Sequence, residues 1–131
     1  MKFLFLLLLV VSCATPVYQK IGDNGYRVGY EDTQLSRDRY QVRFVHTKKK
    51  QVYVGFLRRS AEITLAKKKK FFCEISSQTG KDGNDQLILG GAAKDWSLDQ
   101  HVGVIILKNM SSGDKCYEAL EIISRTKQFE E

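Results

Sequence analysis

The sequence lacks any apolar run that could cross a membrane, and it lacks the common catalytic and metal-binding motifs. Its longest apolar run, Phe3 to Val11, has nine residues, whereas a membrane-spanning helix needs about 20. The two histidines, His46 and His101, show no paired spacing, and no two of the three cysteines form CxxC. No P-loop, GxGxxG or GxSxG pattern occurs. We therefore expect no catalytic residue, no metal and no cofactor.

Length and composition indicate one globular domain. The chain has 131 residues, of which 43% are hydrophobic and 27% charged, and about 100–200 residues make one domain. The net charge is +6 at pH 7. A net positive charge of this size is compatible with binding to nucleic acid, with binding to an anionic membrane surface, or with a role in solubility alone. The cellular location of the protein decides among these possibilities.

The N-terminus indicates export. Lys2 supplies a positive charge, and the apolar run that follows has the length of a secretory signal core. It ends in Val10-Val11-Ser12-Cys13, which resembles the lipobox of bacterial lipoproteins. Residues 1–12 are then a lipoprotein signal peptide, Cys13 is the lipidated residue, and residues 13–25 are a tether. Ala14 after the cysteine resembles lipoproteins sorted to the outer membrane, facing the periplasm.

Two other interpretations of the N-terminus remain open. Ser12-Cys13-Ala14 also fits an ordinary secretory cleavage site, which would remove Cys13. The apolar run could instead form a buried helix. Lipidation is favoured because the run ends abruptly at Cys13 and a polar stretch, Thr15 to Asn24, follows.

Export makes disulfides available to the two remaining cysteines, Cys73 and Cys116. A bridge would need Cys73 to face the final helix, with Cys116 on the apolar side of that helix. The alternative is a pair of buried free thiols, since cysteine behaves as a small hydrophobic residue.

Hydrophobic periodicity predicts a single domain over residues 26–131, with the order β-β-α-β-β-α. Apolar residues alternate or cluster in the four expected strands and recur at helical spacing in the two expected helices. The strands are 26–31, 39–46, 71–76 and 101–107, the last being central. The first helix carries its apolar stripe over 53–65 and is closed by the lysines at 67–70, and the second helix is 115–126. Residues 77–99 form a long loop in which Leu87 to Leu89 could add an edge strand. The simplest fold is α+β, a four-stranded mainly antiparallel sheet with both helices on one face.

Side-chain positions within the two helices follow from the same spacing. Arg58, Arg59 and Glu62 are expected on one side of the first helix, and the buried side is expected to carry Tyr53, Phe56, Leu57, Ala61, Thr64 and Leu65. Arg59 and Glu62 are three residues apart and can pair across one turn. In the final helix, the expected apolar side carries Cys116, Ala119, Leu120 and Ile123.

Several segments together resemble a family of small, uncharacterised bacterial envelope lipoproteins. They are Gly29-Tyr30, Tyr40-x-Val42-x-Phe44, Arg59 to Leu65, Phe72 and Tyr117-Glu118-Ala119. They match a GYS-type strand opening, an RAAELTL-type helix and a YDA-type final helix. The resemblance implies an envelope lipoprotein and no assigned activity. Family members tend to have glycine where this chain has Lys68, which puts a left-handed glycine cap on the first helix in doubt.

The main functional hypothesis is a membrane-anchored, non-enzymatic binding or scaffolding protein of the cell envelope. Its lysine runs, 48–50 and 67–70, lie at opposite ends of the first helix rather than on one face, which disfavours nucleic acid. They fit an anionic envelope polymer or lipid, or a solvated surface, and another envelope protein is a further candidate partner. The alternative function is an enzyme, or an enzyme accessory, acting on cell-envelope material.

Overall fold

A computed structural model describes residues 18–22, 27–81, 98–110, 113 and 115–129 of the chain. The signal segment, Cys13 and the expected edge strand at Leu87 to Leu89 lie outside the described residues. The elements in chain order are β1 (Gly29–Ser36), β2 (Arg39–His46), α1 (Lys49–Ala66), β3 (Phe71–Lys81), β4 (Asp99–Lys108), β5 (Cys116–Glu118), α2 (Ala119–Arg125) and the 3-10 helix η4 (Lys127–Phe129).

The fold is α+β, with an antiparallel sheet of five strands in the order β1-β2-β4-β3-β5 and two helices. Four strands were expected, and that number is wrong because Cys116–Glu118 is a strand that pairs with the start of β3. The expected final helix from residue 115 therefore begins only at Ala119. β4 lies in the middle of the sheet, as predicted.

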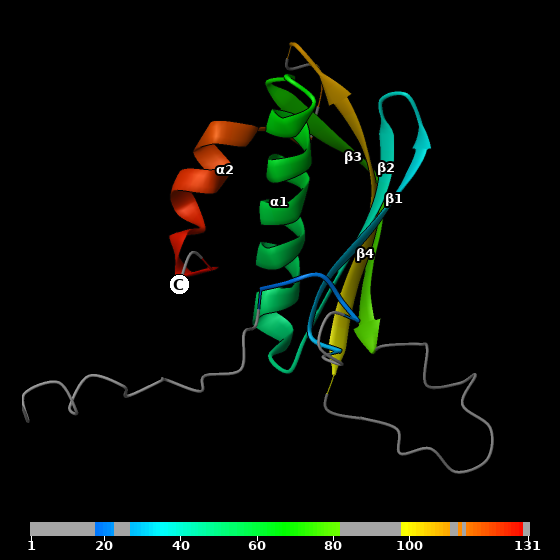
Figure 1. Ribbon diagram of the computed structural model, residues 1–131, viewed down its shortest axis with the longest axis vertical. Helices are drawn as coiled ribbons and strands as arrows, with labels where there is room; N and C mark the ends of the chain where they lie inside the picture. The colour runs from blue at the N-terminus through cyan, green and yellow to red at the C-terminus, as the bar shows by residue number, and fades with distance from the viewer. Residues whose placement is uncertain (1–17, 23–26, 82–97, 111–112, 114, 130–131) are drawn as a thin grey trace, which may run out of the picture.

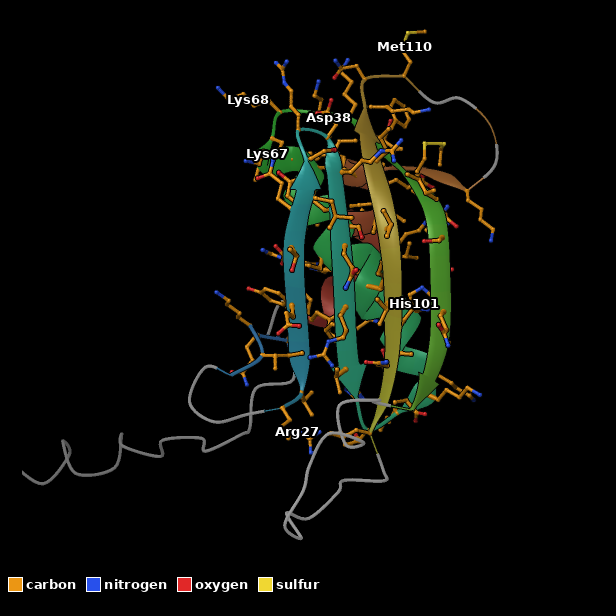
Figure 2. The ribbon with its side chains drawn as sticks, turned by 90° about the vertical axis from the view of Figure 1, so that its right-hand side faces the viewer. Arg27, Asp38, Lys67, Lys68, His101 and Met110 are labelled. Carbon is orange, nitrogen blue, oxygen red and sulfur yellow. A yellow bond between two sulfur atoms is a disulfide. The ribbon has the colours of Figure 1, made fainter. Side chains whose placement is uncertain are left out.

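The two helices lie on one side of the sheet. Figure 1 shows α1 running along the sheet and α2 beside α1, with α1 between α2 and the strands. Figure 2 views the opposite face of the sheet, on which no described helix lies. The strands reflect this arrangement: in β2, Tyr40, Val42 and Phe44 are buried toward the helices, while Arg39 and Gln41 are exposed.

β1 begins and ends later than the predicted strand at 26–31. It continues through Asp32 and Gln34, which lie beyond the predicted strand, and pairs with β2 along its length. Because Tyr30, Asp32 and Gln34 are the partners of Phe44, Val42 and Tyr40, the alternation of side chains turns this row toward α1. The inner face of this edge strand is therefore largely polar.

Glycine occurs at two points where α1 packs against the sheet. A Cβ on Gly55 would lie 2.4 Å from the ring of Phe44, and a Cβ on Gly103 would lie 2.6 Å from the ring of Phe56. Both phenylalanines are fully buried. Each ring thus occupies the space that a side chain on the opposite element would need.

Residues 18–22, which fall within the expected tether of residues 13–25, make contacts with the folded domain. The Tyr18 ring packs on Phe44 and Phe129, at centroid distances of 5.8 and 5.3 Å. The Tyr30 amide donates to the Gln19 carbonyl at 2.7 Å.

Cys73 and Cys116 are joined by a disulfide with a Cα–Cα distance of 4.0 Å. They are direct partners in the β3–β5 ladder. The predicted geometry is wrong, because Cys116 lies in a strand and not in a helix. Cys73 also follows Phe72, which faces the core under α1, so the cysteine points to the opposite face of the sheet.

The predicted faces of the helices are correct only in part. Phe56 and Ala61 are buried, but Leu65 is 37% exposed and Leu120 is 65% exposed. Arg58, expected on the solvent side, is 7% exposed. The reason is that α1 is covered by the sheet on one side and by α2 on another, so a single apolar stripe does not describe its environment.

The Gly103–Phe56 contact gives a prediction for stability. Gly103→Ala should lower the free energy of unfolding by about 1–3 kcal/mol, because the added methyl group overlaps a buried ring. Chemical denaturation measures the change. Gly80→Ala is the matched control in the neighbouring strand, where a Cβ would meet no atom within 4 Å. Equal free energies of unfolding for the two variants would contradict the close contact.

Candidate functional site

The β1–β2 turn and the α1–β3 turn lie at one end of the molecule, together with the end of β4 and the start of α2. The Lys70 amide donates to the Lys108 carbonyl, the Leu107 amide to the Asp38 carbonyl, and the Ala119 amide to the Lys70 carbonyl. These bonds join the β1–β2 turn, the α1–β3 turn and the segments next to β4 and α2. Figure 2 shows Asp38, Lys67, Lys68 and Met110 together at this end, with Arg27 at the other.

Positive charge is concentrated at this end, which we call the basic end. Its eight basic residues are Arg37, Arg39, Lys67, Lys68, Lys69, Lys70, Lys108 and Lys115. The described acidic residues among the same turns are two, Asp38 and Glu118. Six of the eight are exposed, and Lys69 and Lys108 are half-buried. The basic end is therefore a cationic surface open to solvent.

Two lysines at the basic end have left-handed backbone conformations, Lys68 with φ 59° and Lys115 with φ 57°. Among the described residues, they are the non-glycine residues with positive φ. For a residue with a Cβ, this conformation costs about 1–2 kcal/mol. The basic end thus has lysine at two positions where glycine would be less strained.

Lys68 also corrects the expectation about the end of the first helix. The Lys69 amide donates to Thr64 O at 2.9 Å and the Lys68 amide to Leu65 O at 3.0 Å. This is the hydrogen-bond pattern of a Schellman motif. The helix therefore ends with a left-handed cap although lysine replaces glycine.

An apolar groove of about 260 Å³ opens beside Lys69 and Lys70 at the basic end. It is lined by Leu65 from the end of α1 and Leu120 from the start of α2, with Lys69, Lys70 and Glu118 around them. Both leucines are exposed. The basic end therefore combines accessible aliphatic side chains with ammonium groups.

The second lysine run, residues 48–50, lies at the opposite end of α1, as predicted. Lys49 and Lys50 form the first turn of the helix, and all three lysines are exposed. The two runs therefore do not form one continuous basic face.

A separate network of arginines and carboxylates lies on α1. Arg59 Nε donates to Asp32 Oδ1 at 2.7 Å, and Arg59 Nη1 donates to Glu62 Oε1 at 3.3 Å, so the pair predicted from the three-residue spacing is present. The Arg59 guanidinium also lies 4.1 Å above the Tyr30 ring. Burial lowers the pKa of Arg59, but the hydrogen bond and charge of Asp32, with Tyr30 and Glu62, outweigh it and raise that pKa overall. Arg59 thus joins α1 to β1.

Arg58 joins α1 to the end of α2. Its Nη1 donates to the Thr126 carbonyl at 2.8 Å and to the Ile123 carbonyl at 3.3 Å. Its Nε donates to Glu62 at 3.4 Å. The Tyr18 hydroxyl donates to the same carboxylate at 2.5 Å, and burial followed by this hydrogen bond raises the Tyr18 pKa well above its usual value.

The two histidines occupy buried positions with different partners. The Lys48 amide donates to His46 Nδ1 at 2.9 Å. His101 Nδ1 lies 2.5 Å from Thr79 Oγ1, while its Nε2 has no hydrogen-bond partner among the described residues. Burial lowers the pKa of both rings. Next to His101, the Tyr53 and Tyr117 hydroxyls are 2.8 Å apart.

The lowered histidine pKa values predict a loss of stability in mild acid. The unfolded chain takes up a proton near pH 6.5 while the folded His101 resists it, so the free energy of unfolding should fall as pH drops from 7 to 5. The slope should be at most about 1.4 kcal/mol per pH unit for each histidine. His101→Gln should reduce this slope and leave the part due to His46. Denaturation at several pH values measures it, and an unchanged slope would contradict the assignment.

Sequence reasoning found Arg59 and Glu62 but missed Asp32, Tyr18 and the burial of Arg58. For Asp32, the alternation of side chains that includes Tyr30 would have predicted the inward position if it had been continued past residue 31.

In the described part of the chain, no group of three or more His, Cys, Asp or Glu side chains could hold a metal. No described helix is long and apolar enough to cross a bilayer.

Comparisons with known proteins add no relative: the chain matches no family model, no curated protein and no solved structure. The resemblance to envelope lipoproteins therefore stays an expectation from the sequence.

Proposed function

We propose that this protein is a lipid-anchored lipoprotein of the bacterial envelope, held by Cys13, whose basic end binds an anionic lipid surface. The pair of left-handed lysines carries the second part of this proposal. A chain that only needed two tight turns would be more stable with glycine there. The positive charge at these positions is therefore better explained by binding than by folding.

The lipid anchor is supported by the N-terminal sequence. The apolar run, the small residues before Cys13 and the polar stretch after it form the pattern of a lipoprotein signal. Acyl chains on the N-terminal residue would supply stable attachment, since two lipid chains suffice for it. An outer-membrane, periplasm-facing location follows from Ala14 and belongs to the same proposal.

An anionic lipid surface fits the basic end better than an anionic polymer does. Lysines near such a surface contribute about 1 kcal/mol each, and a polymer would use that attraction equally well. Leu65 and Leu120, however, are exposed in a groove that Lys69 and Lys70 also line. Aliphatic side chains among cations match the boundary between headgroups and acyl chains.

The binding role does not require catalysis, and we propose a binding protein rather than an enzyme. The basic end is an open surface whose side chains are mainly ammonium, guanidinium and aliphatic groups, with the carboxylates of Asp38 and Glu118. Such groups attract and orient an anionic surface at neutral pH. They do not provide the paired nucleophile and base that hydrolysis of envelope material would need.

The anchor is tested by Cys13→Ala. The variant should take up no fatty-acid label, because no other thiol lies at the signal boundary. Metabolic labelling with a fatty-acid analogue, followed by membrane fractionation, measures this. Equal labelling of the wild type and the variant would end the lipoprotein proposal.

The basic end is tested by hydrogen exchange of the full chain reconstituted in vesicles. Amide exchange at residues 67–70 and 118–120 should be slower in vesicles that contain an anionic phospholipid than in neutral vesicles. Lys68→Gly/Lys115→Gly should lose most of this protection. The same variant should unfold at an equal or higher temperature, because glycine relieves the left-handed strain.

Lys49→Gln/Lys50→Gln is the matched control, since it removes the same charge from the opposite end of α1. This control variant should keep the slower amide exchange in anionic vesicles. Equal protection in neutral and anionic vesicles would contradict the proposal. Protection by soluble polyphosphate but not by anionic vesicles would assign the basic end to a polymer instead.

A further inference from the structure

A second cavity lies between β1 and α1, next to the arginine–carboxylate network. It has a volume of about 320 Å³, at the small end of the range for ligand pockets. Its lining comes from both elements and from β2: Asp32, Gln34, Tyr40, Arg59, Glu62, Ile63, Ala66 and Lys67. The cavity exists because the inward row of β1 consists of short or flexible polar side chains near this end.

The Tyr40 hydroxyl is an unpaired polar group beside this cavity. Tyr40 is only 5% exposed, and its Oη is buried without a hydrogen-bond partner among the described residues. A buried polar group left unpaired costs about 1–3 kcal/mol. The same residue lines the pocket, so a ligand there could supply the missing partner.

The charges around the cavity are balanced. Asp32 and Glu62 are acidic, and Arg59 and Lys67 are basic. Asp32 uses Oδ1 to bind Arg59, which leaves Oδ2 to accept a further hydrogen bond. Lys67 is exposed at the end of α1. A simple anion would meet two carboxylates and a simple cation would meet two cations, whereas a zwitterion can satisfy both signs.

We propose that this cavity binds a small zwitterion, an amino acid or a dipeptide with small side chains. Its ammonium group would bind Asp32 and its carboxylate Lys67. The Tyr40 hydroxyl would pair with an oxygen of the ligand, and Ile63 and Ala66 provide the apolar wall for a small side chain. This inference shares Lys67 with the basic end, but it does not depend on the lipid anchor or on binding of the basic end to a lipid surface.

Calorimetric titration of the full chain in detergent with alanylalanine tests the proposal. Saturable binding at millimolar concentrations is expected, and the N-acetylated, C-amidated dipeptide should not bind because it carries neither charge. Tyr40→Phe should weaken binding by about three- to tenfold, the effect of one neutral hydrogen bond. The melting temperature of this variant should not fall, because the hydroxyl has no partner within the described protein.

Lys67→Gln should also weaken binding, and Lys68→Gln is its matched control, because Lys68 belongs to the same turn but does not line the cavity. Three results would overturn the proposal. These are the absence of saturable binding, equal binding of the capped dipeptide, and an unchanged affinity in Tyr40→Phe. A lower melting temperature of Tyr40→Phe would also count against it, because the hydroxyl would then have a structural role.

Discussion

Two phenylalanine rings fill the space that two glycines leave between α1 and the sheet, and this contact sets the depth at which the helix lies. Phe44 of β2 packs over Gly55, and Phe56 of α1 packs over Gly103. Since protein interiors are close-packed, a helix held this near the sheet has little freedom to shift or rotate. The other features of the domain take their positions from α1.

The fixed helix brings its polar residues to three different neighbours. Arg59 reaches Asp32 on β1, Arg58 reaches the carbonyls at the end of α2, and Glu62 accepts from both arginines and from Tyr18. Removing one partner from a mostly buried charge pair leaves the other without compensation. The network therefore holds the edge strand, the second helix and the N-terminal segment in register with one another. It also forms one wall of the cavity beside Tyr40.

The sequence predicted what depends on local periodicity and missed what depends on contacts between distant segments. Alternation located β2 and the central β4, and helical spacing located α1 and the Arg59–Glu62 pair. β5 has three residues and exists only because it pairs with β3, so its sequence reads as the start of a helix. Spacing likewise shows which residues share a face of a helix, but it does not show how many faces other elements cover. For this reason Arg58 was wrongly expected to be exposed and Leu65 to be buried. The inward position of Asp32 and the unpaired hydroxyl of Tyr40 require the folded register.

The proposed function depends most directly on how the chain is attached to a membrane. The intact mass of the protein, extracted from membranes in detergent without reductant, tests this attachment in one measurement. The predicted mass is that of a chain beginning at Cys13 with acyl groups on that residue, reduced by two hydrogens for the Cys73–Cys116 disulfide. A chain that begins after Cys13, or that carries no acyl group, would contradict the proposed lipid anchor.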